Sequence, residues 1–170
     1  MSSENPYTPP EANLAGEGDA SIIELASLGQ RFGAALIDGL ISWVCVGPLM
    51  FAFGYFEYTK QGKTPPFLLT LGLAAIGFVI FALVHSYFLK MNGQTVGKKL
   101  IGIRIADLND NVPELPKVLG LRYLPVNAVA QIPVLGIFIA LIDTLFIFRS
   151  DRRCVHDLIA GTKVVQVKKG

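Results

Sequence analysis

Charged residues are scarce in this chain, and their scarcity excludes an ordinary soluble domain. Asp, Glu, Lys and Arg make up only 16% of its 170 residues, whereas soluble domains carry about 25%. Hydrophobic residues make up 52% of the chain, and they gather in long blocks, which is typical of a membrane protein. The formal net charge of +2 is too small to indicate a nucleic-acid partner.

Cysteine is nearly absent as well. Cys45 lies in the first apolar block and Cys154 in a basic segment near the end. Two such distant cysteines have neither the spacing of metal ligands nor the density of a disulfide framework. We therefore expect two unpaired thiols in a reducing compartment, with no metal and no cofactor.

The first 26 residues lack Lys and Arg altogether, although they hold five acids and three prolines. Such a segment buries too little apolar surface to offset the entropy of ordering it. It is not a signal peptide, because no basic region leads into a short apolar core. We predict a disordered acidic tail over 1–26 and a transmembrane domain over 27–170.

An apolar run over 31–56 is the first predicted membrane span, with Ser27 as a candidate N-cap. A spanning helix needs about 20 predominantly apolar residues. Asp38 lies inside this run, where a carboxylate costs about 2.5–3.5 kcal/mol if it faces lipid. Arg31 shares its helix face but lies about 10 Å away along the axis. We expect each of the two to meet a group from another segment.

The second predicted span covers 67–89, after a short polar loop over 57–66. It carries no formal charge apart from a protonated His85. We expect His85 to be an interfacial histidine near the helix end; a proton-relay role is the alternative.

A basic loop over 90–117 follows. The segment 93–99 superficially resembles a phosphate loop, but three residues instead of four separate its glycines, and Lys99 stands where Ser or Thr belongs. We expect a tight glycine connection there, with Lys98 and Lys99 near anionic lipid head groups. Isoleucines alternate over 101–106 and predict a short strand, whose expected partner is the β-branched run over 162–168.

The last apolar stretch, 117–149, is interrupted by Pro125 and Pro133. It is either one span over 129–148 or a hairpin of two shorter helices. Basic residues crowd both the loop 90–117 and the C-terminal segment. Because such segments stay in the cytoplasm, we favour the hairpin, with both termini cytoplasmic. The expected fold is an all-α membrane protein with two transmembrane helices, this hairpin (or a single third span) and a small two-stranded cytoplasmic β element.

Four motifs resemble the RDD family of small bacterial membrane proteins over about residues 28–167. They are RFGAALIDGLI, GQTVGKKLIGIRIAD over 93–107, LRYLP with Arg122, and DRRCVHDLIAGTKVVQV over 151–167. The family is named for one arginine and two aspartates, which correspond by motif to Arg31, Asp38 and Asp157. The resemblance implies a bacterial inner-membrane protein, and the activity suggested for the family is transport, including cation/proton antiport.

Two functional hypotheses follow. In the first, Asp38 and Asp143 meet between packed helices near Arg31 or Arg122, and this network, with Asp157, exchanges a proton for a monovalent cation or moves a small ligand. In the second, the arginines and aspartates lock the fold of a structural or interaction module.

Two spans and a hairpin are small for a pore, which favours a homo-oligomer or a partner-binding role. An enzyme is not expected, because Cys154 and His156 match no catalytic template. The dipeptide His156-Asp157 is expected to form a turn or a helix start.

Overall fold

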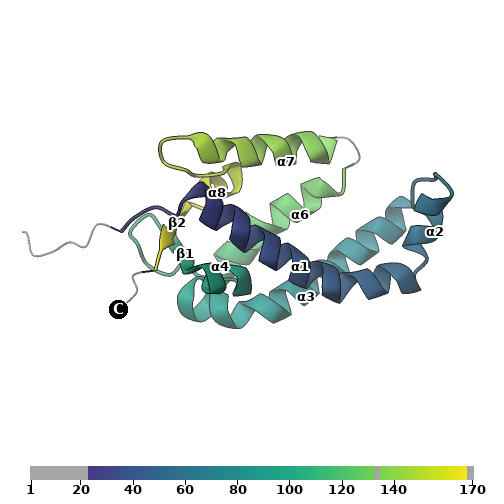
Figure 1. Cartoon of the computed structure of the whole chain (residues 1–170), viewed down its shortest axis with the longest axis horizontal. Helices are drawn as coiled ribbons and strands as arrows, with labels where there is room; N and C mark the ends of the chain where they lie inside the picture. Colours follow the sequence, from purple (N-terminus) through teal and green to yellow (C-terminus); the bar gives the residue numbers. More distant parts are fainter. Residues whose placement is uncertain (1–22, 133–134, 168–170) are drawn as a thin grey trace, which may run out of the picture.

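The computed structural model describes residues 23–132 and 135–167. Two long helices, α1 (Leu28–Ala52) and α3 (Phe67–Asn92), dominate it (Figure 1). Both are long and apolar enough to cross a membrane. Residues 1–22 of the predicted tail 1–26 lie outside the described residues. The last residues of the tail were predicted to be disordered, but Leu25 pairs with Val165 of the sheet.

Helix α1 begins where the sequence predicts. The Ser27 hydroxyl accepts a hydrogen bond from the Gln30 N–H at 3.2 Å, and the Gln30 side chain accepts one from the Ser27 N–H at 2.8 Å. This reciprocal capping box satisfies backbone donors that a helix start leaves free. The helix ends four residues earlier than the predicted span, because Gly54 adopts a left-handed φ of 70° and starts the short helix α2 (Tyr55–Lys60).

Helix α3 returns the chain to the end of the molecule where α1 begins (Figure 1). It ends at Gly93, whose left-handed φ of 67° closes the last turn. The six-residue helix α4 (Val96–Ile101) follows at once and packs against α1. Strand β1 (Ile103–Asp107) therefore starts two residues later than predicted, after Gly102 ends α4 with a φ of 78°.

The predicted pairing of the two β segments is confirmed. Strand β1 runs antiparallel to β2 (Thr162–Gln166), with Ile105 opposite Val164. The sheet also holds the chain just before α1, because the Ala26 N–H donates to the Val164 carbonyl at 3.0 Å. Residues far apart in the sequence thus meet at one end of the molecule.

The last apolar stretch forms two helices rather than one. After α5 (Leu115–Lys117) the chain makes a π-helix, η2 (Val118–Tyr123), and then α6 (Leu124–Ala130). Helix α7 (Leu135–Leu145), with its 3-10 extension η3 (Phe146–Phe148), packs back against α6. This arrangement is the predicted hairpin; no single helix covers 129–148 in the residues described there.

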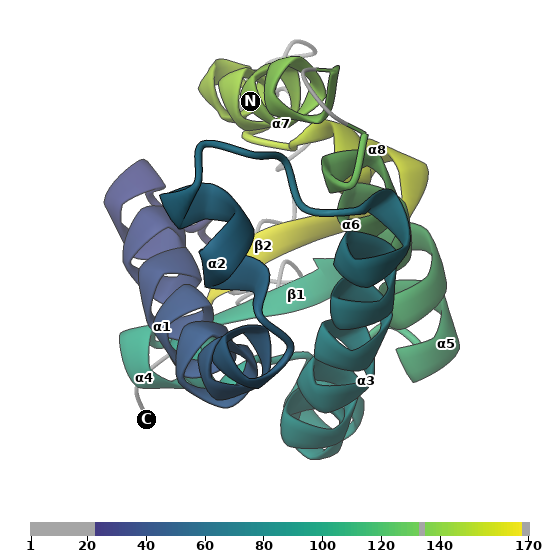
Figure 2. The same cartoon turned by 90° about the vertical axis from the view of Figure 1, so that its right-hand side faces the viewer.

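The core of the protein lies beside the sheet. It is formed by apolar side chains that are almost fully buried, among them Leu89, Ile103, Ile105, Val118 and Val164. Figure 2 shows β1 and β2 crossing behind a ring of helices, with α1 and α3 on opposite sides and α7 above them. The short helix α8 (Val155–Ile159) precedes β2 and joins α7 to this core. Outside it, the long helices expose most of their apolar side chains.

Candidate functional site: two buried aspartate clusters beside one cavity

Asp157 holds four elements together at the sheet end of the molecule. Its carboxylate is fully buried and accepts a hydrogen bond from Arg31 Nη1 of α1 at 3.1 Å. Arg122 Nη1 of η2 binds the other carboxylate oxygen. The Thr162 hydroxyl of β2 and the Cys154 N–H at the start of α8 donate to it as well, at 3.1 and 3.2 Å. Both buried arginines therefore have a counterion in the same carboxylate.

The charge of Asp157 is secured by these neighbours. Burial alone would raise the pKa of this carboxyl group, but Arg122, His156 and Arg31 outweigh burial and lower its pKa to about 2. The carboxylate is therefore ionised at neutral pH. Arg31 meets a group from another segment, as the sequence predicts. Arg122 is only 3% exposed and binds Asp157; its predicted role, structural or in lipid contact, stays a prediction.

Asp38 is the centre of a second cluster, formed by α1, α3 and α4. The Gly97 N–H donates to its Oδ1 at 2.7 Å, and the Thr95 hydroxyl donates to its Oδ2 at 2.5 Å. Lys98 Nζ lies 3.8 Å from the carboxylate. Asp38 is 9% exposed, so it faces protein, as expected. The first turn of α4 is thus occupied by a carboxylate of the same chain, which agrees with rejecting a phosphate loop at 93–99.

Gly97 permits this close contact between α1 and α4. A Cβ atom at this position would overlap the Ala34 carbonyl oxygen and would lie 2.9 Å from Asp38 Oδ1. Only a residue without a side chain lets the Gly97 N–H reach the carboxylate.

His85 is a member of the Asp38 cluster that the sequence interpretation missed. It is fully buried within the protein, and its place at the membrane interface stays a prediction. Its Nδ1 accepts from the Val96 N–H at 3.2 Å, which assigns the proton to Nε2. Nε2 lies 4.0 Å from Asp38 Oδ1 and makes no hydrogen bond within the described residues. The residue that could have indicated this contact is Gly93, because the turn at this glycine folds α4 back over the end of α3.

Asp143 belongs to a separate contact, so the predicted meeting of Asp38 and Asp143 is wrong. In α7, Asp143 accepts from the His156 backbone N–H at 2.9 Å, and its other oxygen lies 2.6 Å from His156 Nδ1. Asp38 is held instead by α4. Among the described residues, the two carboxylates make no hydrogen bond to each other.

The two lysines of α4 have different environments. The Lys98 side chain is 12% exposed, and its ammonium group lies 3.8 Å from Asp38. Lys99 is exposed, with its ammonium group 4.0 Å from the centre of the Phe88 ring. Contact of Lys99 with lipid head groups stays a prediction.

A cavity of about 1090 Å³ connects these groups. It is lined by residues of both long helices, η2, α6, α7 and α8. The charged side chains in its wall are Arg31, Asp38, Lys98, Arg122 and Asp143, with His156 beside them. They belong to the sheet end, whereas the wall nearer α2 is mostly apolar and aromatic, with Trp43, Met50 and Tyr55 among its residues. The charged groups of the cavity are therefore gathered at the sheet end.

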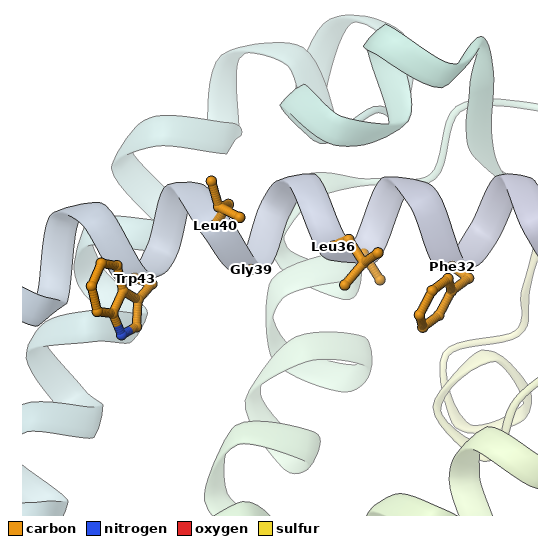
Figure 3. Close-up of a pocket in the computed structure, with 6 residues that line it drawn as sticks. Phe32, Leu36, Gly39, Leu40 and Trp43 are labelled. Carbon is orange, nitrogen blue, oxygen red and sulfur yellow. The ribbon is translucent and has the colours of Figure 1, made fainter.

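A shallower groove on α1 has no such chemistry. Figure 3 shows its side chains, Phe32, Leu36, Leu40 and Trp43, along one face of the helix around Gly39. Each of these four side chains is more than half exposed, and the groove contains no charged group. This groove therefore offers no charged group to a ligand.

The long apolar helices, together with the buried arginines and aspartates where they meet the sheet, define a small helical membrane protein. The sequence model of the RDD family matches residues 25–161. The chain belongs to the RDD family. The arginine and two aspartates to which the resemblance points, Arg31, Asp38 and Asp157, lie in the two clusters described above.

Two curated relatives are similar over nearly the whole chain. An uncharacterized protein of Haemophilus influenzae is 29% identical over 160 residues, which cover 94% of this chain and 89% of the relative. The uncharacterized protein YckC of Bacillus subtilis is 32% identical over 153 residues, covering 88% of this chain and 90% of the relative. No solved structure matches the chain.

Proposed function

We propose that this protein crosses the bacterial inner membrane with α1 and α3, with the hairpin of α6 and α7 in the same layer. Both termini are then cytoplasmic. The distribution of charge supports this orientation: the loop at the far end, 57–66, has two lysines, whereas the sheet end carries most of the basic residues. Basic segments remain preferentially on the cytoplasmic side.

We also propose that the protein transports a monovalent cation or another small ligand, with Asp38 as the group that exchanges a proton. The observation that carries this proposal is the cavity, whose wall includes Asp38. Ionisable groups within a membrane domain are functional candidates by default. His85 Nε2–H, 4.0 Å from the carboxylate, places a proton donor beside Asp38. Exchange of one proton for one monovalent cation at Asp38 preserves the charge of the cluster.

A structural or interaction module is the second candidate, and the Asp157 cluster favours it. This carboxylate joins α1, η2, α8 and β2 without needing a substrate. A homo-oligomer fits either candidate, because two spans and a hairpin are small for a pore. That the protein is not an enzyme stays a prediction.

Flux measurements separate the two candidates. Purified protein in liposomes should move protons when a gradient of Na⁺, Li⁺ or K⁺ is applied, and Asp38→Asn should abolish that flux, because the amide keeps the shape of the side chain but cannot exchange a proton. Asp151→Asn is the matched control, since Asp151 lies in an exposed ion pair with Arg149 outside the cavity; it should retain the flux.

Wild-type protein that moves no proton with any of these cations would remove the proposal of cation-coupled proton exchange. If Asp38→Asn retained wild-type flux, Asp38 would not be the coupling group. If the variant instead lost abundance and thermal stability, and wild-type protein gave no flux, the structural module would stand.

A further inference from the structure

Three side chains from α7 and α8 gather at one side of the cavity. Asp143 lies near the end of α7, Cys154 caps α8, and His156 lies in its first turn. One potential ligand atom from each lies within 4.8 Å of the other two. We propose that Asp143, Cys154 and His156 bind a transition-metal ion, with Zn²⁺ as the best match.

The donor set fits Zn²⁺ better than a hard cation. Zn²⁺ is bound by thiolate sulfur, imidazole nitrogen and carboxylate oxygen, usually in a tetrahedron. Bond lengths of about 2.0–2.3 Å place the ligand atoms of such a tetrahedron about 3.3–3.8 Å apart. His156 Nδ1 and Asp143 Oδ2 are now 2.6 Å apart. Side-chain rotation can open this pair by the additional 1 Å or so that Zn²⁺ needs between its ligands.

The charges and surroundings also suit a divalent ion. A Cys154 thiolate and the Asp143 carboxylate together supply the two negative charges that balance Zn²⁺. On binding, the thiol releases its proton to solvent as the sulfur–metal bond forms. The neighbouring Asp157 does not compete, because its oxygens are engaged by Arg31 and Arg122.

The geometry leaves room for an exchangeable ligand. All three side chains line the cavity. Three protein ligands leave the fourth position of a tetrahedron for water or a bound molecule, which is the pattern of zinc sites that do chemistry or exchange ligands. Cys154 is only 6% exposed, so the sulfur is reached through the cavity rather than from the outer surface.

The cysteine spacing alone could not indicate this site. Cys154 and His156 are two residues apart, whereas Asp143 lies eleven residues before the cysteine in a different helix. The packing of α7 against α8 brings the third donor into place. The inference goes beyond the proposed function and does not depend on Asp38 or on transport.

Metal binding to the full-length protein in detergent tests the proposal. Protein purified without a polyhistidine tag, reduced and treated with a chelator, should bind one equivalent of Zn²⁺ in calorimetry. Co²⁺ as a probe should give the absorption of a tetrahedral site, with a thiolate charge-transfer band. Cys154→Ser should remove that band and weaken Zn²⁺ binding by about 100-fold or more, beyond the 10–100-fold typical of losing an outer-shell partner.

The second free cysteine supplies the matched control. Cys45, in α1, is not in the three-residue cluster, so Cys45→Ser should bind both metals as wild type does. Asp143→Asn should weaken binding while keeping the shape of the side chain. Absence of stoichiometric Zn²⁺ binding by folded wild-type protein would overturn the proposal. So would a Co²⁺ charge-transfer band that survives Cys154→Ser.

Discussion

Replacing Asp157 by asparagine is expected to lower the free energy of unfolding by about 3–5 kcal/mol, the cost of breaking a buried ion pair by removing one partner. The amide keeps the shape of the side chain, but it leaves Arg31 and Arg122, whose side chains are 8% and 4% exposed, without this counterion. Denaturant titration of the purified protein in detergent measures the change, and abundance in membranes should fall with it.

An exposed ion pair supplies the comparison for that experiment. Asp151 pairs with Arg149 at 3.1 Å, and their side chains are 36% and 49% exposed. Exposed pairs contribute at most about 1 kcal/mol, so Asp151→Asn should change the free energy of unfolding by less than that. If Asp157→Asn cost no more than Asp151→Asn, the buried cluster would not be what joins α1 to α8 and the sheet.

The second large effect is expected at Gly97. Its Gly97→Ala variant places a methyl group against the Ala34 carbonyl oxygen and against Asp38. Helix α4 must then move away from α1, and the Gly97 N–H loses its 2.7 Å hydrogen bond to the carboxylate. Overpacking costs about 1–3 kcal/mol, and a lost hydrogen bond to a charged group costs about 1.5–3 kcal/mol. We expect a net loss of about 3 kcal/mol in the free energy of unfolding.

Gly39 is the matched glycine for this test. It lies in α1 near Asp38, but a Cβ atom there would meet nothing within 4 Å. Because alanine favours a helix over glycine by about 1 kcal/mol, Gly39→Ala should leave the free energy of unfolding unchanged or raise it slightly. A Gly97→Ala variant as stable as Gly39→Ala would contradict the close packing of α4 on α1. The same denaturant titration compares the two.

The parts of the fold that depend on local pattern were predictable. The apolar runs predict α1 and α3, because a long stretch of apolar residues favours a spanning helix, although α1 ends four residues earlier than predicted. Ser27 caps α1, since hydroxyl side chains satisfy the free N–H groups of a helix start. The β-branched run over 162–168 and the alternation over 101–106 predicted one another as partners, because a lone strand leaves its backbone groups unpaired.

Contacts between distant segments were less predictable. Arg31 and Asp38 share a helix face, and that spacing indicates only that each needs a partner. The spacing does not identify Asp157 as the partner of Arg31. It also does not indicate that Asp38 contacts α4 instead of Asp143. The alternation over 101–106 predicted a strand from residue 101, but residue 101 is the last residue of α4. Gly102, in a left-handed conformation, separates this helix from the strand. Such choices depend on tertiary packing.

The central claim is that α1 crosses the membrane with Asp38 turned toward protein. Spin labels placed singly along α1, in a chain lacking Cys45 and Cys154, test it in liposomes through collisions with oxygen and with a water-soluble nickel complex. Labels at the exposed Leu36 and Leu40 should collide with oxygen. A label in the loop at Lys60 should collide with nickel, and a label at position 34 should collide with neither. A label at position 38, which lines the cavity, should meet oxygen less often than one at Leu36 and nickel less often than one at Lys60. A label at position 38 that met oxygen as often as one at Leu36, or nickel as often as one at Lys60, would contradict the account.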